Sequence, residues 1–216
     1  TAHATTRLSA NWVSRYLKVQ SNHWQALYPQ TVPFWQPIRP RSVGSILACW
    51  QMESGSMSLD YSKVGATQLL EHAAKQVASL SADKNLAVVV ETEPDLPAFD
   101  GDDDKLRRVL VNLIGNAIKF TPSGGTLTLK AHTEYNDLVF SVTDTGEGIP
   151  AESIGKIFEK FGQVESRKGG RTMSTGLGLT FCKLAVLAHG GHIDVTSIPG
   201  VGSTFSFTIP LTKPTV

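Results

Sequence analysis

The sequence is poor in cysteine, has no excess of charge of one sign and contains no long apolar run. Its two cysteines, Cys49 and Cys182, lie far apart and make neither a disulfide framework nor a metal-ligand pattern, which favours a reducing, cytoplasmic setting. The 20 basic and 19 acidic residues give a formal charge of +1, so composition offers no argument for nucleic acid or a membrane surface as a partner. No apolar stretch approaches the roughly 18 to 20 residues of a spanning helix, and no signal peptide is visible. Any recognition of phosphate must therefore be local.

Closely spaced prolines set the first 57 residues apart from the rest. A long uninterrupted helix cannot pass through Pro29, Pro33, Pro37 and Pro40. Before them, one helix from about Thr5 to Gln25 is predicted by apolar residues at helical spacing, namely Leu8, Trp12, Tyr16 and Val19. The 216 residues, 41% of them hydrophobic, suffice for one to two domains. We divide them into a mostly helical segment, 1–57, and a main domain, 58–216. The first residue is Thr1 rather than Met, which indicates a fragment or a processed form.

The stretch from Asp103 to Thr121 has a strong helical pattern. Its apolar stripe consists of Leu106, Val109, Leu110, Leu113, Ala117 and Phe120, and its polar stripe of Lys105, Arg108, Asn112, Asn116 and Lys119. Most of the remaining surface is apolar as well, so the helix is predicted to be buried nearly all round. The amides of Asn112 and Asn116 stand one turn apart, and leaving a buried polar group unpaired costs about 1 to 3 kcal/mol. Their partners are either other core groups or a bound ligand.

The order of elements predicts the fold class. From residue 63 onward the pattern is helix, strand, helix, two strands, helix, helix and two strands. After the stretch 103–121, the predicted ranges are strands Thr126–His132 and Leu138–Thr143, helices Ala151–Phe161 and Leu177–His189, and strands His192–Ile198 and Ser203–Ile209, preceded by a helix Val64–Leu80 and a strand Leu86–Val90. Paired strands packed under helices give a two-layer α/β sandwich with a mixed sheet. The polar, glycine-containing residues 162–174 predict a mobile loop.

Two glycine motifs follow the asparagine helix. The first, Asp144-Thr145-Gly146-Glu147-Gly148-Ile149-Pro150, follows a predicted strand, and the second, Thr175-Gly176-Leu177-Gly178-Leu179, opens a predicted helix. Glycines at such places allow the backbone to approach a ligand closely. These three signals, in this order, resemble the ATP-binding domain of the sensor histidine kinases, within the family of gyrase, Hsp90 and MutL. The resemblance covers about Glu53 to Leu211 and implies the Bergerat ATP-binding fold.

The resemblance assigns the polar face of the asparagine helix to magnesium and phosphate. Asn116 matches the residue that coordinates Mg²⁺ through its side-chain oxygen, as a hard cation requires. Asn112 borders the same site, Lys119 is placed to reach the phosphates, and Arg108 contributes from the preceding turn. For the side chains of Lys119 and Arg108, the alternative interpretation is a surface charge exposed to solvent. Phe120 completes the nucleotide-binding residues expected on this helix.

The resemblance also assigns a base pocket. Asp144 matches the residue that accepts a hydrogen bond from the adenine amino group, and an acceptor-only carboxylate selects adenine over guanine. Gly146 and Gly148 let the chain pass beneath the base, and Ile149 packs against it. Thr204 matches a residue that completes the adenine pocket, although an ordinary strand residue would read the same way.

The second glycine motif is expected to hold phosphate. Gly176, Leu177 and Gly178 precede a helix whose free amides can bind an anion, a site distinct from a Walker loop, whose lysine signature is absent. The phenylalanine box of the family matches Phe158 and Phe161, and the lid beyond them carries three candidate phosphate contacts, Arg167, Lys168 and Arg171.

The identity of residue 112 bears on the reaction. In the gyrase and Hsp90 branch a Glu one turn before the magnesium Asn activates water, whereas this position holds Asn112, which cannot accept a proton at neutral pH. The resemblance therefore implies an ATP- and Mg²⁺-dependent protein histidine kinase domain, with Asn112, Asn116 and Lys119 as the catalytic residues. Its partners would be a histidine-bearing dimerisation domain and a response-regulator receiver, in a homodimeric full-length protein that does not bind nucleic acid.

Two alternatives stay open. A slow ATPase would use nucleotide-driven closure mechanically, and a regulatory module would bind ATP without transfer. The second alternative has support, because the phosphoacceptor box of the dimerisation domain, a His followed by an acidic residue and then Arg-Thr-Pro, is missing: His3 precedes Ala4, and His23 precedes Trp24. Residues 1–57 are therefore at most a divergent or partial dimerisation region.

Overall fold

A computed structural model describes residues 58–159 and 177–212. The predictions made for residues 1–57, including the helix from Thr5 to Gln25, concern residues outside the described ranges, as does the prediction of a loop at 162–174. The described elements run in the order β1 (Ser62–Val64), α3 (Ala66–Asp83), β2 (Ala87–Thr92), β3 (Phe99–Gly101), α4 (Asp103–Phe120), β4 (Thr126–Glu134), β5 (Asp137–Asp144), α5 (Ala151–Ile154), α6 (Gly178–Ala188), β6 (Ile193–Ile198) and β7 (Gly202–Pro210).

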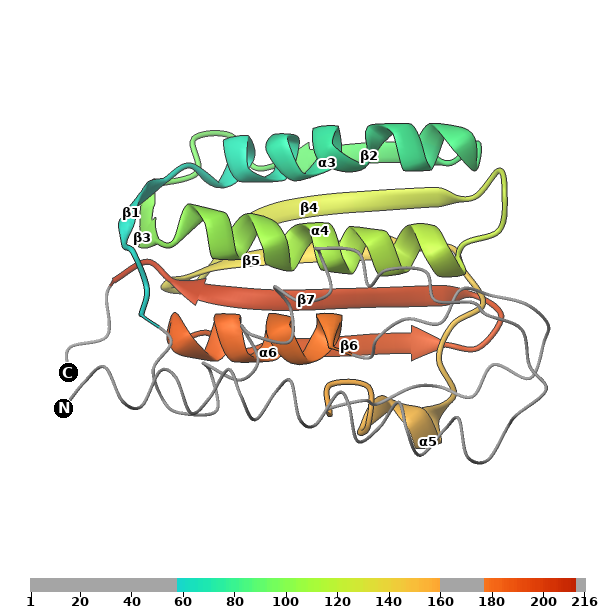
Figure 1. The fold of residues 1–216 in the computed structure, drawn as a ribbon. Helices are drawn as coiled ribbons and strands as arrows, with labels where there is room; N and C mark the ends of the chain where they lie inside the picture. Colours follow the sequence, from blue (N-terminus) through green and yellow to red (C-terminus); the bar gives the residue numbers. More distant parts are fainter. Residues whose placement is uncertain (1–57, 160–176, 213–216) are drawn as a thin grey trace, which may run out of the picture. The chain divides into compact units, whose positions relative to one another are not determined.

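Five strands form one mixed sheet in the order β2-β4-β5-β7-β6 (Figure 1). Strands β2 and β4 pair in parallel, whereas β4–β5, β5–β7 and β7–β6 are antiparallel. The chain between the two parallel strands contains α4, because parallel neighbours need a long crossover. The mixed sheet predicted from the alternating segments is confirmed, and each of the two predicted strand pairs is antiparallel.

The long helices α3, α4 and α6 lie together against one face of the sheet (Figure 1). The burial along β5 explains why: Leu138, Phe140 and Val142 have no exposed surface. On the other face of the strand, Val139 keeps 8% of its surface exposed, and Ser141 and Thr143 are only half-buried. The ring of Phe140 stacks on Phe207 of the neighbouring strand, with centroids 4.9 Å apart. One apolar face and one more polar face give the predicted two layers.

Helix α4 is the centre of the core. Five of the six residues of its predicted apolar stripe are buried, and four of them, Leu106, Val109, Leu110 and Leu113, have no exposed surface; the sixth, Phe120, is half-buried. Asp104 is the single exposed residue of α4, and the polar stripe is half-buried rather than solvated. The helix therefore presents a second face, neither core nor open surface, on which both asparagines lie.

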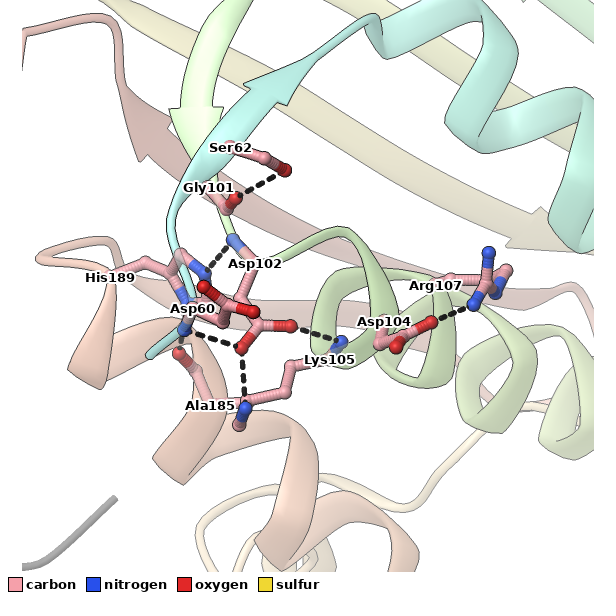
Figure 2. Close-up of polar contacts among 9 residues, drawn as sticks. All are labelled: Asp60, Ser62, Gly101, Asp102, Asp104, Lys105, Arg107, Ala185 and His189. Carbon is pink, nitrogen blue, oxygen red and sulfur yellow. Dashed lines mark hydrogen bonds and ion pairs between the residues drawn. The ribbon is translucent and has the colours of Figure 1, made fainter. Parts of the chain in front are cut away.

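A buried network fixes the first turn of α4 (Figure 2). The Asp102 side chain caps the helix by accepting hydrogen bonds from the backbone N of Lys105 (3.0 Å), from the backbone N of Asp60 (3.0 Å) and from the Lys105 ammonium. Burial acts to raise the pKa of Asp102, but these hydrogen bonds outweigh it and hold the pKa below its usual value. The cap thus ties the segment that precedes β1 to α4.

His189 joins α6 to the same network. Its Nε2 accepts a hydrogen bond from the backbone N of Asp102 (3.0 Å), and its Nδ1 donates to the carbonyl oxygen of Ala185 (2.7 Å). A ring that accepts at one nitrogen and donates at the other is neutral. Burial also lowers the pKa of His189. The start of α4 and the end of α6 are therefore held together through an uncharged imidazole.

One local prediction is corrected, and two short strands are additional to those predicted. The helix predicted over 151–161 ends at Ile154, and turns follow it up to the last described residue of that range. The ribbon of β1 and β3 was not predicted; each strand has three residues, too few for alternation to show. Among the described helices, none is both long and apolar enough to cross a membrane.

Candidate nucleotide-binding site

The half-buried face of α4 meets the first turn of α6. The Asn112 amide nitrogen lies 3.5 Å from the carbonyl oxygen of Gly178, at the long limit for a hydrogen bond. A Cβ added to Gly178 would come no closer than 3.8 Å to the Asn112 side chain. Gly178, from the second glycine motif, thus lies beside the asparagine helix, and Asn112 spans the two.

Asn116 lies one turn further along the same face. Its side chain is half-buried and makes no hydrogen bond to any other residue in the part of the chain that the structure describes. A half-buried amide that protein groups leave without a partner is suited to a ligand, since its oxygen is a hard acceptor. This is the position at which a metal-coordinating asparagine was predicted.

The last turn of α4 is held from outside the helix. The Lys84 ammonium donates to the carbonyl oxygens of Ile118 (2.6 Å) and Lys119 (2.9 Å), a favourable place for a cation because helix carbonyls end there. The Lys119 ammonium lies 5.0 Å from the ring centroid of Phe120. The Phe120 carbonyl in turn accepts a hydrogen bond from the backbone N of Glu147 (3.4 Å). The helix end is therefore joined to the first glycine motif.

Arg108 occupies the boundary between α4 and α6. Its guanidinium carbon lies 4.2 Å above the ring centroid of Phe181. This stacking orients Arg108 across the first turns of α6, where a phosphate group is expected. It is not a solvated surface charge, because it packs on a buried ring.

Asp144 ends β5 and is buried, with 6% of its surface exposed. Burial raises the pKa of its carboxyl group, and hydrogen bonds from the backbone N–H groups of Gly146 and Ser203 act in the opposite direction. The distance from the Gly146 nitrogen to Asp144 Oδ1 is 2.8 Å. Because burial outweighs the two donors, the carboxylate gains from a further donor such as an exocyclic amino group.

The turn after Asp144 has no room for side chains at two positions. A Cβ on Gly146 would lie 2.5 Å from Asp144 Oδ1 and 2.8 Å from the Phe120 carbonyl oxygen. Gly148 has φ +70°, and a Cβ there would lie 2.3 Å from the Ile198 carbonyl oxygen. Ile149, which packs partly buried against the core, donates its backbone N–H to Ser197 Oγ at 2.8 Å. The turn is thus clamped between the end of α4 and the end of β6.

The strand register places Thr204 and Asp144 on opposite faces of the sheet. Thr204 pairs with Thr143, and their hydroxyl oxygens lie 3.0 Å apart on the sheet face opposite to the one that Asp144 shares with the core. Ser203, buried and paired directly with Asp144, occupies the place expected for Thr204. Sequence reasoning missed Ser203 because a shift of one residue exchanges the two faces of a strand. Assigning Phe205 and Phe207 to the core face would have placed Ser203 on that face too, because alternate residues of a strand share one face.

The two chain ends next to the undescribed segment 160–176 are tied together. Thr180 Oγ1 donates to the Glu159 carbonyl oxygen at 3.1 Å, and the Phe158 ring meets Phe205 edge-on at 6.3 Å. Leu177 is buried and precedes the first turn of α6. Five predicted residues of the glycine motif and lid lie outside the described residues: Phe161, Arg167, Lys168, Arg171 and Gly176.

The described residues fit a nucleotide with magnesium. A buried acceptor, Asp144, ends β5 beside the C-terminal end of α4, and Asn116, whose amide has no hydrogen-bond partner among the described residues, lies on α4 itself. Within ranges 58–159 and 177–212, no cluster of three or more His, Cys, Asp or Glu side chains could hold a metal alone. A cation here would need ligand oxygens besides Asn116, and phosphates supply them.

Fold and site together define an ATP-binding α/β domain of the Bergerat type. The chain belongs to the histidine kinase-, DNA gyrase B-, and HSP90-like ATPase family, whose model matches residues 101–213. The relatives point to its histidine kinase branch. One is the adaptive-response sensory kinase SasA of Synechococcus elongatus, 36% identical over 177 residues, which cover 82% of this chain and 45% of that protein.

Two further comparisons also show similarity to histidine kinases. The circadian input-output histidine kinase CikA of the same organism is 34% identical over 170 residues, covering 78% of this chain and 22% of that protein. The solved structure of full-length ShkA in complex with AMPPNP superposes with a TM-score of 0.72 and 28% identity, covering 81% of this chain and 36% of that one. The chain spans less than half the length of these relatives.

Proposed function

We propose that this chain carries the catalytic domain of a protein histidine kinase, which binds Mg-ATP and transfers the γ-phosphoryl group to a histidine nitrogen. In the transfer, the histidine nitrogen bonds to the γ-phosphorus, the bond between that phosphorus and the bridging oxygen breaks, and ADP leaves with the electron pair. The proposed catalytic domain is residues 58–216, and the reaction takes place in the cytoplasm, where ATP is supplied.

The single observation that carries the proposal is the chemistry of Asn112. An amide is neither a base nor an acid at neutral pH, and its nitrogen faces the Gly178 carbonyl. The acidic residues of α4 are Asp103 and Asp104 in its first turn, so the rest of the helix offers no carboxylate to activate water. Transfer to a protein nucleophile needs no such base on α4, because positioning and charge neutralisation supply most of the catalysis.

Each remaining site residue has a proposed task. Asp144 orients the adenine ring, and the turn at Gly146, Gly148 and Ile149 encloses it. Asn116 would hold Mg²⁺ together with phosphate oxygens, and the cation would supply positive charge to the transferred phosphoryl group. Lys119 and Arg108 add positive charge, and Gly178 keeps the start of α6 accessible to phosphate.

The partners follow from the reaction. The acceptor histidine is proposed to reside on a dimerisation domain, in the same chain or in a partner chain of a homodimer, and the phosphoryl group then passes to an aspartate of a response-regulator receiver. The missing phosphoacceptor box favours one rival, an ATP-binding regulatory module without transfer.

One experiment separates these functions. The protein is incubated with γ-labelled ATP and Mg²⁺, alone and with a separate histidine-bearing dimerisation domain, and acid-labile protein label and free phosphate are followed. Label on the added domain, with little free phosphate, is expected. Free phosphate without label indicates an ATPase, and nucleotide binding without either product indicates a regulatory module; each of these results refutes the kinase proposal for this chain.

A further inference from the structure

The hydroxyl of Ser197, on β6, connects the turn that follows Asp144 to the start of β7. Ser197 Oγ accepts a hydrogen bond from the backbone N of Ile149 at 2.8 Å and lies 2.9 Å from the carbonyl oxygen of Gly202. It also lies 3.0 Å from Ser203 Oγ. Three contacts from two segments, the turn after β5 and the start of β7, converge on one half-buried hydroxyl.

The number of hydroxyl protons fixes the direction of each bond. A serine hydroxyl has one proton to donate and two lone pairs to accept with. The Gly202 carbonyl can only accept, so the Ser197 proton points to it, and the Ile149 N–H takes one lone pair of Ser197. The remaining lone pair accepts from Ser203, whose only proton is thereby committed to Ser197. The Ser203 oxygen is left as an acceptor alone.

That oxygen belongs to the residue across the ladder from Asp144. Ser203 and Asp144 are directly paired on β7 and β5, and each has 6% of its surface exposed. Cross-strand partners of this kind have their Cβ atoms about 4.5 to 5.5 Å apart on one face of the sheet. The base end of the site therefore carries two neighbouring acceptors, the Asp144 carboxylate and the Ser203 oxygen.

We propose that Ser197, which does not itself touch the base, is a positioning residue that sets nucleotide specificity by keeping the Ser203 hydroxyl turned away from the base as a donor. This inference rests on the proposed binding of ATP at Asp144. Adenine presents an amino donor where guanine presents a carbonyl acceptor. Two acceptors at this position favour the adenine amino group and repel the guanine carbonyl oxygen. A Ser203 hydroxyl free to rotate could donate to the guanine carbonyl or accept from the adenine amino group, and would therefore accommodate either base.

The test compares ATP and GTP analogues rather than overall affinity. AMPPNP and GMPPNP, each with Mg²⁺, are titrated against the wild type, Ser197→Ala, the hydroxyl-retaining Ser197→Thr, and Thr196→Ala as control. Thr196 is the exposed neighbour on β6, on the opposite face of the sheet. Ser197→Ala is expected to lower the GMPPNP-to-AMPPNP ratio of dissociation constants about tenfold, the equivalent of one neutral hydrogen bond. Ser197→Thr restores the ratio, and Thr196→Ala leaves it unchanged.

The contrary outcomes are equally definite. If Ser197→Ala weakens both analogues by the same factor, Ser197 only supports the turn, and the proposal is wrong. Should Ser197→Ala not fold, Ser203→Ala takes its place, because removing the acceptor must also reduce the ratio; an unchanged ratio there overturns the inference. A wild-type protein that binds neither analogue refutes the proposed function and this inference with it, whereas binding with an unaltered ratio refutes the inference alone.

Discussion

Replacing Asp144 by Asn is expected to weaken nucleotide binding without weakening the fold. The side chain is nearly isosteric, so the turn that follows β5 keeps its shape. The backbone N–H of Gly146, 2.8 Å from Oδ1, will hold the amide oxygen of the new residue. The amide NH₂ then occupies the other position and meets the adenine amino group as donor against donor. A flip of the amide offers no escape, because it turns the NH₂ towards the Gly146 N–H.

The structure sets the size of this effect. Asp144 is 6% exposed, so its contact with a base is shielded from water, and a hydrogen bond to a charged group in such a place contributes about 1.5 to 3 kcal/mol. At about 1.4 kcal/mol per factor of ten, the dissociation constant should rise about 10- to 150-fold. Burial already raises the pKa of Asp144, which means that the buried charge is unfavourable in the free domain. Its removal should leave thermal stability equal or higher.

Titration calorimetry with Mg-AMPPNP measures the first quantity, and a thermal melt without nucleotide measures the second. Asp137→Asn is the matched control, since Asp137 lies at the other end of the same strand. An affinity within a factor of two of the wild type would remove Asp144 from the base pocket. A large loss of stability would instead show that the carboxylate is a structural element of the turn.

Three further outcomes are expected. Asn116→Ala should abolish the Mg²⁺ dependence of AMPPNP binding while leaving the melting temperature unchanged, because its amide has no partner among the described residues; a preserved dependence would contradict the proposed metal ligand. Gly146→Ala should destabilise the turn and weaken binding, since its Cβ would lie 2.8 Å from a backbone oxygen, whereas Gly155→Ala, which meets nothing within 4 Å, should do neither. The pKa of His189 is lowered from 6.5 in the folded state, so the neutral ring contributes stability above pH 6.5, and this contribution is lost as the pH falls from 6.5 through the lower folded pKa. Thermal melts from pH 8 to 5 should therefore show a melting temperature that falls with pH, and His189→Gln should reduce this dependence.

Local sequence patterns determined the elements and the general position of the site. Helix α4 has 18 residues, which repeat the apolar spacing often enough to define both its core face and the stripe that carries Asn112 and Asn116. The strands β4 and β5 have nine and eight residues, so their alternation also reveals which side is buried. Gly146 and Gly148 marked the turn because close backbone contact and a positive φ leave little choice of residue.

Tertiary structure alone decided which groups meet. The three-residue strands β1 and β3 pair across 35 or more positions of sequence, and neither is long enough to show a period of its own. Whether Ser203 or Thr204 stands beside Asp144 depends on the register between β5 and β7, and a strand that carries hydroxyls on both faces does not specify that register locally. The same holds for Ser197, whose three partners come from a turn and a neighbouring strand. A hydrogen-bond network of this kind exists only after the sheet has brought distant segments within about 3 Å of one another.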